Sequence, residues 1–335
     1  MIIVSANSGR WLRPCLSSVF AHAGDAALDV VVVAAECTDD TVDVAAGFSD
    51  VRVLHERNRG FAYGNNRAFL ATTAPYVLFL NPDTQILRGT LGELVRELEN
   101  RPDVGLIGVR QQTADGTLWP TIRRFPSPLR HLFEALGSEH LPVRARWLGE
   151  RELDPGAYDR ETRCDWTSGS FMLARREAIL AAGLMDERFF IYCEEPDLCL
   201  RIKQAGWDVR HLPSMTIVHH AGRSAFDARF VAQEAFARRQ YMEKHFPPLR
   251  RHTAIAAYAL GYAIRAVAGG RDRRRAREQR SASRAALAVL MGRAEPPFAR
   301  PPRQSLAPLR RVYSGTRMIP MPKNPPADSI SSRLS

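Results

Sequence analysis

The chain has 335 residues and an ordinary globular composition, 45% hydrophobic and 25% charged, so it is long enough to bury a large core. Its net charge of +11 is uneven: residues 250–335 hold 18 Lys and Arg against 4 Asp and Glu, which leaves residues 1–249 slightly acidic. The basic charge therefore belongs to the tail. This argues against a nucleic-acid groove through the core and favours contact between the tail and an anionic surface.

Five cysteines, without paired zinc-ligand spacing, indicate reduced thiols in a cytosolic protein. The first residues lack the basic leader and long apolar run of a signal peptide. No run of about 18 uncharged apolar residues is present, so we expect no membrane-spanning helix.

The first 100 residues alternate short apolar runs with helical patterns, which predicts a doubly wound α/β fold with a mostly parallel sheet. The predicted strands are residues 2–4, 29–33, 51–54 and 76–80. The fourth strand stops at Asn81-Pro82-Asp83, because proline cannot continue a ladder. Asp83 thus follows the carboxyl end of a core strand, where open α/β sheets bind ligands. Taken alone, it could equally be a turn former or a helix cap.

Residues 58–66 hold two glycines and three asparagines in a loop that enters a helix. Glycine permits close backbone approach, and free N–H groups at a helix start suit an anion such as a diphosphate. An ordinary turn is the alternative interpretation. Residues 119–163 then lose all periodicity apart from a short helix near 129–136, and we expect a lid or an acceptor wall there.

Later elements repeat the α/β pattern: helices at 88–100 and 176–182, strands at 104–109 and near 171–173, and short strands at 207–211 and 216–219. Pro196 fits the first position of a further helix that Gly206 stops, which places Glu195 at its mouth. Glu195 is then either a helix-end partner or a general base. Asp83 and His219 offer the oxygen and imidazole donors that Mg²⁺ or Mn²⁺ accept.

The tail differs in character. Residues 254–267 are apolar almost all round and suit a core-docked or interfacial helix. Residues 271–284 carry seven arginines, which indicates either a solvated basic helix or a segment that binds an anionic leaflet. Nine prolines from residue 296 onwards predict disorder.

Six segments in order resemble the family 2 glycosyltransferases, and most closely their bacterial rhamnosyltransferase-like branch. The resemblance covers about residues 1–245, and the segments are Asn7-Ser8 and residues 58–66, 79–84, 166–172, 186–201 and 219–224. It implies a GT-A fold and inverting transfer of a sugar, of which rhamnose is one candidate, from a nucleoside diphosphate sugar.

The resemblance also implies the site residues. Glu195 falls at the catalytic base, and Asp83 and His219 at the metal ligands. The nucleotide-sugar positions are Asn7, Glu36, Asn58, Gly60, Asn65, Asn81 and Asp83; the acceptor positions are Trp166, Gly169, Glu194 and Asp197.

Two positions depart from the family pattern. Ala34 stands where the family has an Asp that holds the nucleotide, for which Glu36 or Asp39 could substitute. Glu195 replaces the family's usual Asp and adds a methylene, and a misplacement of about 1 Å can cost roughly 100-fold in rate. These departures motivate an alternative, a non-catalytic glycosyltransferase-like protein that binds a partner or a glycan and has lost nucleotide binding. A sugar nucleotidylyltransferase needs a glycine- and arginine-rich first loop, which residues 7–10 do not provide.

The sequence thus predicts a glycosyltransferase domain over residues 1–249, with a nucleotide-sugar half (1–100) and an acceptor half (101–249). A helical apolar and basic extension (250–295) and a Pro-rich tail (296–335) follow. We expect a cytoplasmic protein, peripheral at the inner face of the cell membrane, that uses Mg²⁺ or Mn²⁺, binds no nucleic acid and acts on a cell-envelope glycan or lipid-linked acceptor.

Overall fold

The computed structural model describes residues 1–135, 148–220, 227–267 and 273–298. The chain divides into two units, residues 1–301 and 302–335, and all described residues belong to the first. The predicted disorder from residue 296 falls almost wholly outside the described residues.

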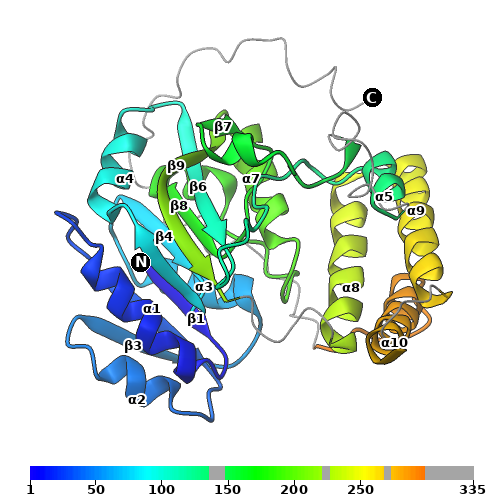
Figure 1. Ribbon diagram of the computed structural model, residues 1–335, viewed down its shortest axis with the longest axis horizontal. Coiled ribbons are helices and arrows are strands. Elements are labelled where there is room, and N and C mark those ends of the chain that lie inside the picture. Colours follow the sequence, from blue (N-terminus) through cyan, green and yellow to red (C-terminus); the bar gives the residue numbers. More distant parts are fainter. Residues whose placement is uncertain (136–147, 221–226, 268–272, 299–335) are drawn as a thin grey trace. The chain divides into compact units, whose positions relative to one another are not determined.

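A single mixed sheet forms the centre of the described chain (Figure 1). Its strands are β1 (Ile2–Ser5), β2 (Val30–Ala35), β3 (Val51–Glu56), β4 (Tyr76–Leu80), β5 (Thr84–Arg88), β6 (Val104–Gln112), β7 (Thr162–Arg163), β8 (Phe171–Arg175) and β9 (Asp208–His219). The order is β3-β2-β1-β4-β8-β6-β9-β5, and β7 pairs with β9.

Strands β1 to β4 form the predicted parallel half, with the order reversing at β1 as in doubly wound sheets. β2 is buried along its whole length, as its unbroken apolar run predicts for a strand covered on both faces. β8 lies antiparallel between β4 and β6, and β6 pairs in parallel with β9. The predicted α/β fold is confirmed.

Two strand predictions were wrong. The two short strands expected at 207–211 and 216–219 are one continuous strand, β9, because a register shift against β6 absorbs the turn-like residues around Pro213. β5 was missed because it directly follows the Asn-Pro-Asp turn; it pairs antiparallel with the end of β9, placing Thr84 opposite His219.

Some of the helices cover the two faces of the sheet, and others pack against one another beside it (Figure 1). The helices are α1 (Gly9–Ala21), α2 (Thr41–Ala46), α3 (Phe61–Leu70), α4 (Leu91–Glu99), α5 (Pro128–Ala135), α6 (Arg176–Ala182), α7 (Glu194–Gln204), α8 (Ala228–His245), α9 (Pro248–Val267) and α10 (Arg273–Leu290), with a short 3₁₀ turn at Pro155–Tyr158. Buried residues of α1, α2 and α4 share the main core with one face of the strands. α3, α6 and α7 also pack on the strands but contribute no residue to that cluster. They therefore cover the opposite face of the sheet.

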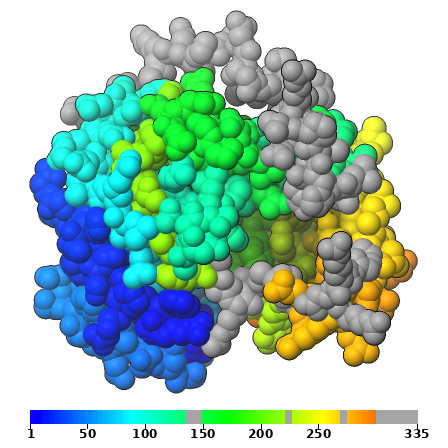
Figure 2. Space-filling view, in the orientation of Figure 1, coloured from blue at the N-terminus to red at the C-terminus, as the bar shows by residue number. Residues whose placement is uncertain are grey.

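The helices α8, α9 and α10 share their own apolar cluster, which includes Ala235, Met242, Ala254, Tyr258 and Leu290. They are drawn from yellow-green to orange in Figures 1 and 2. The predicted boundary at residue 249 falls in the first turn of α9, inside this group of helices. None of the helices within the described residues is both long and apolar enough to cross a membrane.

Candidate active site

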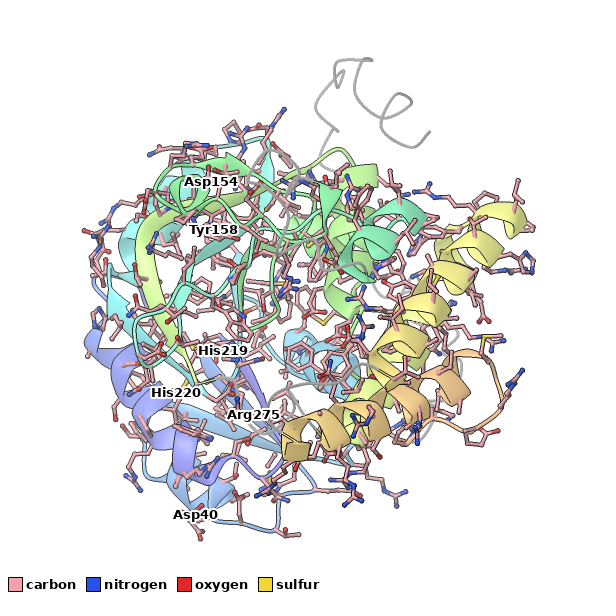
Figure 3. The ribbon with its side chains drawn as sticks, turned by 45° about the vertical axis from the view of Figure 1, so that its right-hand side comes forward. Asp40, Asp154, Tyr158, His219, His220 and Arg275 are labelled. Atoms are coloured by element: carbon pink, nitrogen blue, oxygen red, sulfur yellow. The ribbon has the colours of Figure 1, made fainter. Side chains whose placement is uncertain are left out.

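Asp83 and His219 lie together at one edge of the sheet. Asp83 follows β4, His219 ends β9, and the amide of His220 donates to the carbonyl of Asp83 at 2.9 Å. His219 Nε2 lies 3.4 Å from Asp83 Oδ1. Figure 3 labels both histidines at this end of β9. Two segments 136 residues apart in the chain thus converge on one point, as the sequence predicted.

This pair fits a divalent cation. Two ligands that each bind an ion at about 2.1 Å can lie up to roughly 4.2 Å apart, and the separation of 3.4 Å falls within that range. A carboxylate oxygen with an imidazole nitrogen suits Mn²⁺ better than Mg²⁺, which prefers oxygen alone. The other ring nitrogen of His219, Nδ1, is buried and has no hydrogen-bond partner among the described residues.

Aromatic side chains that the sequence did not single out surround the histidines. Trp119 meets the His219 ring edge-on at 5.9 Å between centroids, and Trp11 stacks on His220 at 4.6 Å. His220 Nε2 is also 2.6 Å from Gln85 Oε1. No sequence signal distinguishes these residues: Trp119 stands in the irregular stretch, and Gln85 in the missed strand.

Glu195 lies in the first turn of α7 and points at Gly169. The amide of Gly169 donates to Glu195 Oε1 at 3.1 Å, and a Cβ at Gly169 would come within 2.8 Å of that oxygen. A larger residue at position 169 would therefore displace the carboxylate from this position. Burial raises the pKa of Glu195, which the Gly169 hydrogen bond only partly offsets, although the side chain keeps some exposed surface. A carboxylate with a raised pKa and an open edge suits a general base.

A short chain of contacts connects Glu195 to the Asp83–His219 pair. Gly169 binds Glu195, and the carbonyl of the next residue, Ser170, accepts from the amide of Asn81 at 3.0 Å. Asn81 is two residues before Asp83. Glu195, the predicted base, and the predicted metal ligands therefore lie on either side of the contact between Ser170 and Asn81.

The start of α7 differs from the prediction. The helix begins at Glu194, two residues before Pro196, because Cys193 adopts a left-handed conformation at φ 68° and takes the cap position. Glu194 is consequently drawn into the interior, with 2% of its surface exposed. Burial, and then the charge of Glu195, raises the pKa of Glu194 well above its ordinary value.

Asp197 was predicted to bind the acceptor, and the structure contradicts this. Its carboxylate is fully buried and already pairs with Arg201 on α7 and with Lys244 and His245 on α8, at 2.5 to 2.9 Å. Burial opposes ionisation, but these partners hold the pKa of Asp197 below its ordinary value. Asp197 joins α7 to α8.

At the predicted nucleotide side, Asn7 shapes a loop. Its φ is 61°, and its side-chain oxygen accepts from the amides of Thr38 and Asp39 at 2.7 and 3.2 Å. Glu36 follows β2 with its side chain exposed, whereas the carboxylate of Asp39 is engaged with the amides of Gly9 and Thr41. Glu36 is therefore the open carboxylate near Ala34.

In the loop 58–66, some of the groups that were expected to face a diphosphate already have partners within the protein. The amide of Phe61, at the start of α3, donates to the carbonyl of Phe190 at 2.6 Å, so this N–H is not available to a diphosphate. Gly60 has φ 101°, and a Cβ there would lie 2.3 Å from the same carbonyl. The Asn58 side chain accepts from the Gly60 amide at 3.3 Å, and Asn65 is buried, bonding the Phe61 carbonyl. Glycine at position 60 thus serves to dock the segment around Phe190.

Trp166 lies close to Gly169 in the chain, within the half that was predicted to bind the acceptor. Its indole N–H donates to the carbonyl of Arg124 at 3.0 Å, and 8% of its surface is exposed. Arg124 belongs to the irregular stretch 119–163, where we predicted a lid or an acceptor wall. Part of that stretch, residues 136–147, lies outside the described residues.

Comparison with known proteins assigns the first part of the chain to a family. Residues 1–156 match the family described as Glycosyl transferase family 2. This segment is a family 2 glycosyltransferase sequence. Over 152 residues the chain is 33% identical to an N-acetylglucosaminyl-diphospho-decaprenol L-rhamnosyltransferase of Mycobacterium tuberculosis, covering 44% of this chain and 48% of that one. It is 26% identical to the rhamnosyltransferase WbbL of Escherichia coli over 182 residues, 51% of this chain and 66% of WbbL.

The matches to these relatives therefore span about half to two thirds of their length. Among solved structures, the mannosyltransferase PcManGT of Pyrobaculum calidifontis, in complex with GDP-Man and Mn²⁺, superimposes with a TM-score of 0.52 at 16% identity. The superposition covers 87% of this chain and 85% of that one, and it shows the GT-A fold. The predicted family, its rhamnosyltransferase-like branch and the fold are confirmed.

Proposed function

We propose that this family 2 glycosyltransferase is an inverting, metal-dependent rhamnosyltransferase. It takes the sugar from a nucleoside diphosphate donor. The observation that carries the proposal is the placement of Glu195, through Gly169 and Ser170, beside the loop that holds Asp83 opposite His219. A base and a cation site at one strand edge are the two elements that direct displacement requires.

In the proposed reaction Glu195 removes the proton from an acceptor hydroxyl. The hydroxyl oxygen bonds to the anomeric carbon from the face opposite the diphosphate, the bond to the diphosphate oxygen breaks, and its electron pair leaves with the diphosphate. One displacement inverts the anomeric centre. A divalent cation bound by Asp83 and His219 would supply positive charge for the departing diphosphate.

The acceptor is proposed from the relatives. The mycobacterial relative is named for N-acetylglucosaminyl-diphospho-decaprenol, a lipid-linked sugar. We propose a lipid-linked glycan acceptor of the cell envelope for this chain also, reached from the cytoplasmic face of the membrane.

Peripheral membrane binding through α9 and α10 follows from that acceptor. α10 exposes Arg274, Arg275, Arg277 and Arg284, and α9 exposes Leu249, Leu260 and Val267. Exposed arginines beside exposed aliphatic side chains suit an anionic leaflet, with roughly 1 kcal/mol for each basic group close to it.

A donor screen tests the proposal against the non-catalytic alternative. Calorimetry with UDP, dTDP and GDP, each with and without Mn²⁺, is followed by transfer assays with the corresponding sugars. We expect tight binding of one nucleotide only with Mn²⁺, and transfer from its sugar. No binding of any nucleotide would favour the non-catalytic alternative, which has lost its nucleotide contact at Ala34, whereas Mn²⁺-dependent binding of one nucleotide would exclude that alternative. Nucleotide binding without transfer to any lipid-linked acceptor would contradict the proposed acceptor.

A further inference from the structure

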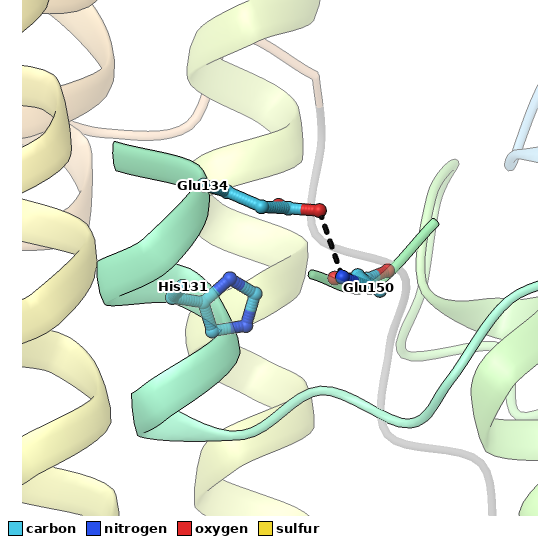
Figure 4. A group of neighbouring side chains, drawn as sticks. All are labelled: His131, Glu134 and Glu150. Carbon is cyan, nitrogen blue, oxygen red and sulfur yellow. Dashed lines mark hydrogen bonds between the residues drawn. The ribbon is translucent and has the colours of Figure 1, made fainter. Parts of the chain in front are cut away.

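A second group of metal-ligand side chains lies away from the Asp83–His219 pair, where α5 meets the segment that begins at residue 148. His131 and Glu134 are three residues apart on α5 and so share one face of the helix. Figure 4 shows both extending towards Glu150. The amide of Glu150 donates to Glu134 Oε1 at 3.0 Å, which fixes the two segments together.

Two donor atoms in this group are buried and unused. His131 is 3% exposed and Glu150 is 1% exposed. His131 Nε2 and Glu150 Oε1 have no hydrogen-bond partner among the residues that the structure describes. A buried polar atom without a partner is destabilising, so two such atoms in one cluster indicate a missing ligand.

The distances suit a small ion. One ligand atom from each of the three residues lies within 4.8 Å of the other two. Ligands of zinc lie at about 2.0–2.2 Å, hence up to roughly 4.2 Å from each other, so a small side-chain rotation closes the remaining gap. One imidazole and two carboxylates suit Zn²⁺, whereas Ca²⁺ and Mg²⁺ require six or more oxygen ligands, several of them often water.

A basic side chain, Arg238 of α8, contacts the cluster. It binds Glu150 Oε2 at 3.0 Å and also contacts Glu234 at 2.9 Å and the Tyr258 hydroxyl. Glu150 Oε1 has no hydrogen-bond partner among the described residues. Glu134 and Glu150 bring two carboxylates close together beside one imidazole in a largely buried cluster. A bound cation would reduce the repulsion between the two carboxylates.

We propose that His131 Nε2, Glu134 and Glu150 Oε1 bind one Zn²⁺ ion, separate from the cation at Asp83 and His219. The amide of Arg124 donates to the Glu150 carbonyl at 2.8 Å, and the Arg124 carbonyl accepts from the Trp166 indole at 3.0 Å. The ion would thereby link α5, through Glu150 and Arg124, to Trp166. Its role is structural.

The test uses the full chain with Asp83→Asn and His219→Gln, which removes the proposed active-site cation ligands. After dialysis against EDTA, the protein is titrated with ZnCl₂, and bound zinc is measured by mass spectrometry and located by anomalous diffraction at the zinc edge. We expect one equivalent, with its peak in contact with His131 Nε2. No retained zinc, or a peak elsewhere, would overturn the proposal while leaving the proposed transferase function untouched.

Variants give a second test in the same background. His131→Gln and Glu134→Gln each remove a ligand, so zinc affinity should fall by more than the roughly 10- to 100-fold that loss of an outer-shell partner costs. Glu243→Gln, which removes an exposed carboxylate that pairs with Arg239, is the matched control and should bind zinc as before. Equal affinity in all three folded variants contradicts the assignment. If the first two do not fold, the position of the anomalous peak decides alone.

Discussion

Three acidic side chains within four residues of α7 have three different environments. Glu195 is partly exposed and accepts from one amide, Glu194 is buried with an unpartnered Oε2 among the described residues, and Asp197 is buried against Arg201, Lys244 and His245. The sequence shows only an acidic cluster at a helix start. The helix start that separates these environments includes the left-handed Cys193, which a propensity argument does not predict.

The raised pKa of Glu195 sets a pH profile. The base acts only when ionised, so kcat/KM for transfer should fall as pH drops through a pKa above the ordinary 4.5. Assays between about pH 5 and pH 9 measure this fall of kcat/KM at low pH, the acidic limb of the profile. In Glu195→Gln the acidic limb should disappear, and the rate should be lower by roughly 10²- to 10⁴-fold. An unchanged acidic limb in that variant would assign the titration to another group.

At the scale of elements, the network around Asp197 joins α7 to α8. Asp197→Asn should lower the free energy of unfolding by about 3–5 kcal/mol, because Lys244, His245 and Arg201 would lose a buried partner. Urea denaturation measures this. The matched control is Asp159→Asn, whose exposed pair with Arg110 should contribute less than about 1 kcal/mol.

The same network has a pH dependence of known sign. The folded-state pKa of Asp197 lies below the ordinary 3.8, so its stabilisation is present above that value and is lost as pH falls below it. Asp197→Asn should therefore reduce the difference in stability between neutral and acid pH. An equal difference in wild type and variant would contradict the pairing.

The loop at Gly60 is a second element with a sharp test. Gly60→Ala places a methyl group 2.3 Å from the Phe190 carbonyl at a φ of 101°, so the segment around Phe190 must shift. We expect a loss of at least 2 kcal/mol, on the order expected for strain plus overpacking, and weaker donor binding. Gly116→Ala is matched in φ (85°) but meets nothing within 4 Å, and it should cost about 1 kcal/mol. Thermal unfolding and calorimetry compare the two.

For the molecule as a whole, the repeated strand–helix pattern was enough to predict the α/β fold. An unbroken run of β-branched residues such as Val30–Val33 is typical of a strand that is buried on both faces. The residue types suggested Asp83 and His219 as metal donors and the resemblance matched them to the family's ligands, but β5 and the long β9 that bring them together were not recognised. The cluster of His131, Glu134 and Glu150 and the contacts of Trp119 each join distant segments, at least one of which lies in the irregular stretch, so no local pattern predicts them.

Membrane binding is tested on the whole chain. Sedimentation with vesicles that contain anionic lipid should capture the protein, and replacing Arg274, Arg275, Arg277 and Arg284 with Ala should weaken capture by up to about 4 kcal/mol. Capture should also weaken with salt. Replacing Arg52, Arg67, Arg96 and Arg188, exposed on the sheet domain, is the control for total charge. Equal loss in both sets would indicate a non-specific charge effect.

The central claim is that Glu195 activates the acceptor while Asp83 and His219 hold the donor's cation. Single-turnover transfer and donor binding, measured on the same samples of wild type, Glu195→Gln and Asp83→Asn, test it most directly. The account predicts that Glu195→Gln binds donor as wild type does but loses about 100-fold or more of the transfer rate, whereas Asp83→Asn loses both. Full transfer by Glu195→Gln, or Mn²⁺-dependent donor binding unchanged in Asp83→Asn, would contradict it.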